Sequence, residues 1–294
     1  MSNKLRKMTL EKKHNLTGWA FLAPATFLIA VFSFWPMIKA LVLSFQTGKG
    51  RNMQMAGFTN YIRMFQDDVF IQSIKNTFFY FILQVPIMLV VALVLACILN
   101  KKDLRFKGFF RTMIFVPCTT SLVAYSIIFR SLFANNGLVN YVLVNIGILD
   151  KPYNFLTQPF AAKMVILLGL LWRWTGYNMV FFLSGLQNIE YSVYEAAKID
   201  GASAIQTFFK ITVPLLKPTI LLTAIMSTNG TLQLFDESVN LTDGGPANAS
   251  ISMSHYIYNL CFKYVPNFGY AAAMSFFILP VSYTHLRAHE TAAN

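Results

Sequence analysis

Charged residues are scarce in this 294-residue chain, and the common catalytic motifs are missing. Asp, Glu, Lys and Arg make up 12% of the residues, against about 25% in ordinary soluble proteins. The sequence contains no GxxxxGK[ST] phosphate-binding loop, no GxSxG nucleophile elbow and no HExxH zinc motif. Its three cysteines form no CxxC pair, so we expect no structural disulfide, and we predict neither a metal nor a cofactor. These absences disfavour an enzyme.

Long apolar runs are abundant instead. Six segments carry almost no charge, and each approaches or exceeds the roughly 20 residues that a helix needs to cross a bilayer. They are residues 15–38, 76–100, 112–129, 164–189, 218–235 and 264–284, and Arg173 is the only charged residue in any of them. The sequence therefore predicts an all-α polytopic membrane protein with six transmembrane helices.

The distribution of basic residues predicts the orientation of these helices. Five Lys and Arg precede the first run and five more lie between residues 101 and 111, whereas the loops on the other side are sparser in positive charge. Positive charge favours the cytoplasmic side in short loops, so we expect the N-terminus in the cytoplasm. With six spans, the loop at 186–218 also faces the cytoplasm. Basic residues split among loops in this way make nucleic-acid binding a weak interpretation.

The loop at 186–218 is amphipathic and contains a predicted turn. Tyr194, Ala197 and Ile199 lie on one side of a first helical piece and charged residues on another, before Gly201 supplies the turn and a second helix follows. Small residues at this corner would let another protein approach the backbone. The alternative is a connector packed against its own bundle. The candidate docking residues are Glu195, Ala196, Ala197, Asp200, Gly201 and Ala202.

Polar residues recur along the fifth span. Asn229, Gln233, Asp236 and Asn240 are spaced by four, three and four residues, which places them on one face of a helix. Amides and a carboxylate in one stripe suit a pathway for a solute rich in hydroxyl groups, because they offer both donors and acceptors. Alternatively, the last two residues lie in the outer mouth and are simply solvated.

The fourth span contains one buried cation within LWRWTGYNM, residues 171–179. Arg173 lies about 15 Å deep at 1.5 Å per residue, so it should face water, a cavity or a polar partner. A structural arginine bonded to carbonyl groups is an equally good interpretation. We count Arg173, Trp174 and Asn178 with Asn229, Gln233 and Asp236 as candidate substrate-pathway residues, and Trp172 offers a further apolar ring.

The end of the chain departs from this pattern. From Pro280 the sequence reads PVSYTHLRAHETAAN, where a sixth helix should still be apolar. We therefore expect a permease domain over residues 1–280, a truncated last helix, and a non-native tail at 281–294.

The segment EAAKIDGASAIQTFFKITVP, residues 195–214, resembles the EAA loop of binding-protein-dependent ABC importer permeases. It has Glu-Ala-Ala, a Gly after three further residues, and Ile-x-x-Pro after nine more. Val213 stands where that family more often has Leu. Further similarity to carbohydrate-uptake permeases extends to about Leu279 and includes FFRTMIFVP, NNGLVN and LTDGGPANAS, and it is greater to the first of the two paired permeases.

This resemblance implies a bacterial inner-membrane subunit that translocates a sugar or oligosaccharide. Its implied partners are a second permease, two ATPase subunits and an extracytoplasmic sugar-binding protein. The loop would be the coupling helix in a cleft of the ATPase, with Glu195 making a polar contact and with Gly201 and Ala202 permitting close approach. Two alternatives remain: an ion-coupled secondary transporter acting alone, and a structural membrane subunit that passes no solute.

Overall fold

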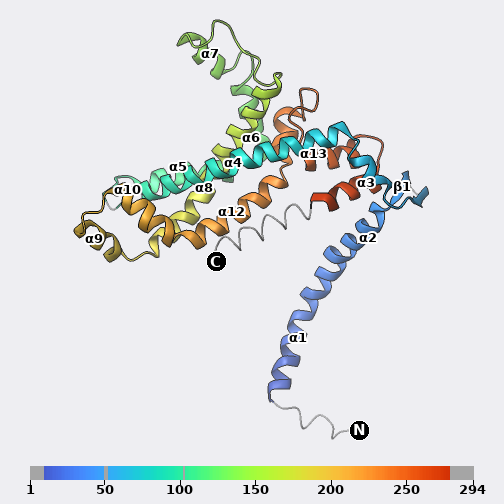
Figure 1. Ribbon diagram of the computed structural model, residues 1–294, viewed down its shortest axis with the longest axis horizontal. Helices are drawn as coiled ribbons and strands as arrows, with labels where there is room; N and C mark the ends of the chain where they lie inside the picture. Colours follow the sequence, from blue (N-terminus) through green and yellow to red (C-terminus); the bar gives the residue numbers. More distant parts are fainter. Residues whose placement is uncertain (1–9, 50–51, 102, 279–294) are drawn as a thin grey trace.

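The N-terminal helices form a rod that extends away from the rest of the chain (Figure 1). The computed structural model describes residues 10–49, 52–101 and 103–278. Helix α1 (Leu10–Ile29) continues through a π-helical turn (Ala30–Phe34) into α2 (Trp35–Ser44). Its 31-residue apolar stretch, His14–Ser44, can span a membrane, and none of its most apolar part is buried against the chain. This rod confirms the predicted first helix.

A small hairpin follows the rod. Strands β1 (Gln46–Lys49) and β2 (Asn52–Met55) pair antiparallel and lead into helix α3 (Thr59–Met64). Asn60 fixes this corner because its amide donates to the carbonyls of Ser44 and Gln46, at 2.9 and 2.8 Å. The hairpin corrects the all-helical prediction, which missed a polar two-stranded element.

Two long helices form the centre of the bundle. Asp67 caps the N-terminus of helix α4 (Asp68–Asn100), because its carboxylate accepts from the N–H groups of Val69 and Phe70 at 3.0 and 3.2 Å. Helix α8 (Pro159–Gln187) packs along α4. Their shared apolar core contains Ala92, Leu93, Ala96, Leu99, Met179, Phe182, Leu183 and Leu186. Burial of this face holds the two helices together.

The residues of the predicted third span form two helices joined by a sharp bend. Helices α5 (Lys107–Thr119) and α6 (Leu122–Leu132) meet at an angle of 99°. The bend arises because the backbone of Thr120 and Ser121, between the two helices, is extended. Helix α7 (Leu138–Asn145) lies beyond α6, in an arm that projects from the bundle (Figure 1).

A second broken pair contains the predicted amphipathic loop. Helix α9 (Tyr191–Ile199) is followed by α10 (Ala204–Thr207), a π-helical turn (Phe208–Thr212) and α11 (Val213–Leu215). Helix α12 (Lys217–Leu232) then departs at 70°. The predicted helix, turn and second helix are confirmed. In Figure 1, α9 and α10 lie at the end of the bundle opposite the hairpin.

The remaining described segment packs on the hairpin end of α4. It contains a π-helical turn (Ser238–Thr242), α13 (Met253–Tyr258), another π-helical turn (Asn259–Lys263) and an apolar helix, Phe268–Ile278. Tyr256 and Tyr270 both donate to the Asp67 carboxylate at 2.7 Å. These bonds join the end of the described chain to the start of α4.

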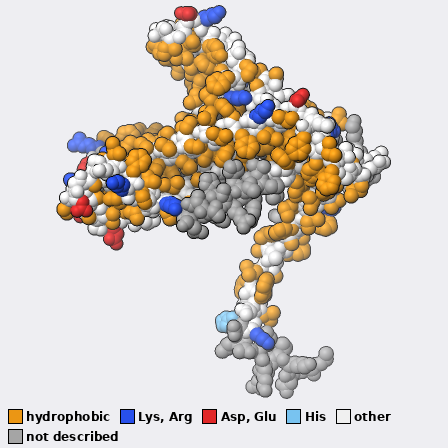
Figure 2. All heavy atoms as spheres, in the orientation of Figure 1, with side chains coloured by type: hydrophobic (Ala, Val, Ile, Leu, Met, Phe, Trp, Pro, Cys, Tyr) orange, Lys and Arg blue, Asp and Glu red, His pale blue; other side chains and the backbone are white. Residues whose placement is uncertain are grey.

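Several helices are long and apolar enough to cross a membrane. Within the described residues there are three such helices, or up to five if each bent pair forms one span. The sixth predicted span is described only as the 11-residue helix Phe268–Ile278, and the predicted tail at 281–294 lies outside the described residues. Hydrophobic side chains cover the rod and the bundle in Figure 2, while charged groups gather at the α9 end and beyond α7.

Candidate substrate cavity and coupling loop

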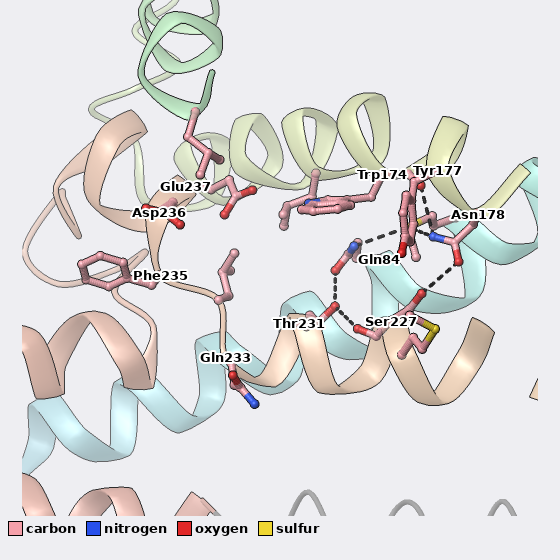
Figure 3. Close-up of a pocket in the computed structure, with 16 residues that line it drawn as sticks. Gln84, Trp174, Tyr177, Asn178, Ser227, Thr231, Gln233, Phe235, Asp236 and Glu237 are labelled. Atoms are coloured by element: carbon pink, nitrogen blue, oxygen red, sulfur yellow. Dashed lines mark hydrogen bonds between the residues drawn. The ribbon is translucent and has the colours of Figure 1, made fainter. Parts of the chain in front are cut away.

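A cavity of about 380 Å³ lies between α4, α8, α12 and the residues that follow α12. Its volume is within the ~300–1,000 Å³ typical of small-molecule sites. Trp174 and Tyr177 of α8 contribute aromatic rings, with centroids 5.9 Å apart. The polar side chains of its wall are Gln84, Asn178, Ser227, Thr231, Gln233, Asp236 and Glu237. Figure 3 shows these groups around the cavity.

Hydrogen bonds connect the polar residues across three helices. Thr231 donates to the Gln84 amide oxygen at 2.6 Å, which joins α12 to α4. Ser227 donates to the Asn178 amide oxygen at 3.2 Å, which joins α12 to α8. The Asn178 amide nitrogen in turn donates to the Trp174 carbonyl at 3.1 Å. These contacts hold donors and acceptors in fixed positions on one side of the cavity (Figure 3).

The polar stripe of the predicted fifth span does not lie on one helix. Helix α12 ends at Leu232, and Gln233 to Phe235 form a break before the next turn begins. The Leu234 carbonyl, which this break frees from helical bonding, accepts from the Ser252 hydroxyl at 2.5 Å. The expectation of one continuous face is therefore wrong. The break places Gln233, Asp236 and Glu237 at the cavity wall.

Four of the six predicted pathway residues line the cavity, and two do not. Trp174, Asn178, Gln233 and Asp236 belong to its wall. Asn229 is exposed and accepts from the Gln233 amide at 2.8 Å, so it neighbours the wall without forming it. Arg173 is not in the cavity wall; it is adjacent to Trp174 on α8, and its side chain reaches the link between α5 and α6 instead.

Arg173 stabilises the bend between α5 and α6. Its guanidinium donates to the Thr120 carbonyl at 2.8 Å, in the extended link between the two helices. The side chain is buried, and its guanidinium carbon lies 5.6 Å from the Tyr125 ring centroid and 5.5 Å from that of Trp174. The geometry thus matches the structural alternative, an arginine bonded to a carbonyl. Trp172 stacks on Tyr125 and does not reach the cavity, because it lies two residues from Trp174 on the helix.

Glu237 is a cavity residue that the sequence did not reveal. It is 5% exposed. The pKa of the Glu237 carboxyl lies above its ordinary value, mainly because the group is buried and also because Asp236 is adjacent. A backbone hydrogen bond, a hydrogen bond with Trp174 and the charge of Arg173 offset part of this rise. Gln84, Tyr177, Ser227 and Thr231 were also missed as site residues. The spacing of four between Trp174 and Asn178, and between Ser227 and Thr231, is the signal that could have indicated two facing polar rows.

The predicted coupling residues lie together at the corner between α9 and α10. Gly201 has φ +75°, a left-handed conformation that glycine adopts without strain, so it makes the predicted turn. A capping box follows, in which Ser203 and Gln206 satisfy each other's backbone N–H groups. Glu195, Ala196, Asp200 and Gly201 are exposed, Ala202 is half-buried, and Ala197 is buried.

Large apolar side chains of this loop also face outward. Ile199 is 85% exposed, Ile205 71% and Phe209 65%. All three belong to the corner between α9 and the helix that follows it. Exposed apolar side chains beside carboxylates are typical of a surface that another protein covers.

Comparison with known proteins matches the chain to a family model of membrane transport components and to sugar transport permeases. Residues 69–286 match the family described as "Binding-protein-dependent transport system inner membrane component". The chain is 51% identical over 275 residues to the lactose transport system permease protein LacF of Rhizobium radiobacter, covering 93% of this chain and 92% of that protein. It is 32% identical to the arabinooligosaccharides transport system permease protein AraP of Halalkalibacterium halodurans, covering 86% and 80%.

Solved structures with the same fold come from an alginate importer. One is a bacterial ABC transporter involved in the import of the acidic polysaccharide alginate, with a TM-score of 0.84, 24% identity, and 96% of each chain covered. The other is a bacterial alginate ABC transporter in complex with its pentasaccharide-bound periplasmic protein. It has a TM-score of 0.82 and 25% identity, and the match covers 95% of this chain and 94% of that chain.

Proposed function

Because this chain belongs to the family of binding-protein-dependent transport system inner membrane components, we propose that it is a membrane-spanning subunit of an ATP-driven sugar importer. It translocates a sugar or oligosaccharide delivered by an extracytoplasmic binding protein. The permease itself is not an enzyme, since ATP hydrolysis belongs to a separate subunit. The observation that carries the proposal is the exposed corner at Gly201, with its apolar and acidic side chains at one end of the bundle.

The proposed assembly contains a second permease, two ATPase subunits and a sugar-binding protein. The relatives named for lactose and arabinooligosaccharides support a carbohydrate as the solute. The solved alginate importer with its periplasmic protein supports delivery by a binding protein. This chain takes the place of the first of the two paired permeases.

The loop transmits force from the ATPase to the bundle. Glu195 makes a polar contact with the ATPase, while Ile199, Ile205 and Phe209 supply an apolar surface that its cleft covers. Ala197 is buried, so it lies behind this surface rather than on it. The rest of the surface that the ATPase approaches closely is formed by Ala196, Asp200, Gly201 and Ala202. Closure of the ATPase pair then moves the loop and changes the side on which the cavity opens.

The cavity is part of the sugar pathway. Trp174 offers a ring face to the apolar side of a sugar, and Asn178, Gln233 and Asp236 hydrogen-bond its hydroxyl groups. Asn229 positions Gln233 through their hydrogen bond. Arg173 contributes indirectly because it fixes the bend beside the cavity.

The proposed topology has six spans with the N-terminus in the cytoplasm, in the bacterial inner membrane. The bent pair at 107–132 forms one span, α12 (Lys217–Leu232) forms the fifth span after the cytoplasmic loop, and the last span begins in the helix Phe268–Ile278. We also propose that the permease domain ends near residue 280 and that 281–294 are non-native, although the family match extends to residue 286. Resequencing the locus tests this; a clean read through Asn294 to a natural stop codon would reject it.

Reconstitution tests the function directly. Proteoliposomes that contain this chain, its paired permease and the ATPase subunits should take up sugar only with ATP inside and binding protein outside. Liposomes with this chain alone should show no uptake under a proton or sodium gradient. Uptake by the chain alone, driven by an ion gradient without ATP, would instead establish a secondary transporter. Unchanged cellular uptake after deletion of the chain would indicate a subunit that passes no solute.

A further inference from the structure

The cavity contains two adjacent carboxylates and no lining cation. Asp236 is half-buried and Glu237 is 5% exposed, and both belong to its wall. Among the described residues that form this wall, none is Lys, Arg or His. In the view of Figure 3, the two carboxylates lie at one end, beside Trp174, and the amide and hydroxyl network lies at the other. Asp236 thus places a carboxylate at the cavity wall that no lining cation balances, whereas burial raises the pKa of the neighbouring Glu237 carboxyl and favours its neutral form.

The neighbouring cation only partly offsets this charge. The charge of Arg173 reaches Glu237, but its guanidinium is bonded to the Thr120 carbonyl and stacks near two aromatic rings. The guanidinium lies behind the wall, so it does not face a solute in the cavity as the Asp236 carboxylate does. Apolar walls such as Leu122 and Leu170 exclude water and strengthen the field.

We propose that this cavity selects neutral sugars over anionic ones, and that Asp236 and Glu237 are the residues that determine this specificity. The inference rests on the proposed sugar pathway and adds the charge class of its substrate. The Asp236 carboxylate accepts hydrogen bonds from the hydroxyls of a neutral sugar, and the Glu237 carboxyl beside it can donate or accept. A sugar carboxylate in the same place meets like charge in a confined site, which weakens its binding about 10- to 100-fold. The same residues thus favour the binding of neutral sugars and disfavour that of anionic sugars.

A matched pair of disaccharides tests the proposal. Galabiose and digalacturonate share their linkage and ring configuration and differ in the carboxylates at C6. Their equilibrium binding would be measured by calorimetry on the complex of this chain, its paired permease and the ATPase subunits in nanodiscs. The binding protein is left out because its own specificity would mask that of the permease. The variants are Glu237→Gln, Asp236→Asn and the double variant, which keep the side-chain shapes.

The expected result is a selective gain for the acidic sugar. The double variant should bind digalacturonate at least about tenfold more tightly than the wild type does, with galabiose affinity changed by less than about threefold. Asp150→Asn is the control, because it removes an equal charge from an exposed position outside the cavity wall. It should leave both affinities unchanged.

Other outcomes separate the two proposals. Retained galabiose binding with no gain for digalacturonate in the double variant would overturn the charge selection and leave the sugar pathway standing. If the wild type binds galabiose and digalacturonate with equal affinity, the charge selection is likewise overturned, and the sugar pathway is unaffected. A tenfold loss of galabiose binding without a gain for digalacturonate would show that the carboxylates act only as hydrogen-bond acceptors. Absence of galabiose binding to the wild type would count against the cavity as a sugar site.

Discussion

Substitution of Gly201 separates two reasons for a glycine at the coupling corner. Its φ of +75° lies in the left-handed region, and a Cβ there would meet open space within this chain. An alanine therefore incurs only backbone strain, about 1–2 kcal/mol, which lowers the population of the native turn by a factor of about 5–30. A leucine adds bulk that only a docked partner would meet. Asparagine tolerates the left-handed conformation but also adds a side chain.

If the loop enters a cleft of the ATPase, the three variants should rank by size. Gly201→Leu should abolish transport and the stimulation of ATPase activity, Gly201→Asn should reduce both strongly, and Gly201→Ala should be the mildest. If only the turn conformation matters, Gly201→Asn should work better than Gly201→Ala. The assay is ATP hydrolysis by the reconstituted importer, with and without sugar-loaded binding protein, together with the yield of membrane-inserted complex.

A second glycine supplies the control. Gly147 also has φ +75° with open space around its Cβ, but it follows α7, in the arm that projects from the bundle. Gly147→Leu carries the same backbone strain and bulk at a site outside the loop, so its ATPase stimulation should stay near the wild-type level. Normal stimulation and uptake in Gly201→Leu, with the complex assembled, would refute the coupling role of this corner.

Three further predictions concern the packing that positions the cavity and the rest of the bundle, and thermal unfolding of the purified complex measures each. Arg173→Met should lower stability by about 1–3 kcal/mol because it leaves the Thr120 carbonyl unpaired; equal or greater stability would show that burial of the cation outweighs its bond. Gly176→Val should be destabilising by about 1–3 kcal/mol or more, because its Cβ would overlap the Ile114 carbonyl of α5, and an unchanged midpoint would contradict that close approach. Burial raises the pKa of the Asp67 carboxyl, but bonds from two tyrosines and two N–H groups lower it more, so its net pKa lies below the ordinary value. Its stabilisation is then present above the carboxyl's unfolded-state pKa and is lost as pH falls through the lower folded-state pKa. Asp67→Asn should lack this acid-dependent loss, and identical pH profiles would reject the role.

Local sequence patterns were sufficient to predict those features of the structure that depend on residues close together in the sequence. The apolar run at 15–38 predicted the first rod, because a charge-free helix of that length is stable in a bilayer regardless of its partners. The corner at Gly201 was also predictable, since turn chemistry and amphipathic spacing act over a few residues. The low content of charged residues likewise indicated a membrane protein.

The tertiary structure decided where helices break and which side chains meet. The bends at Thr120 and after Leu232 depend on distant groups, Arg173 and Ser252, that satisfy the freed carbonyls. Periodicity assumes an unbroken helix, so it placed Asp236 on a stripe and overlooked Glu237. The sequence alone determined a membrane bundle with an amphipathic loop that turns at Gly201, because hydrophobic length and turn residues are local properties. Only the packing of α4, α8 and α12 assembled the acidic cavity, because its walls come from residues more than 100 positions apart in the chain.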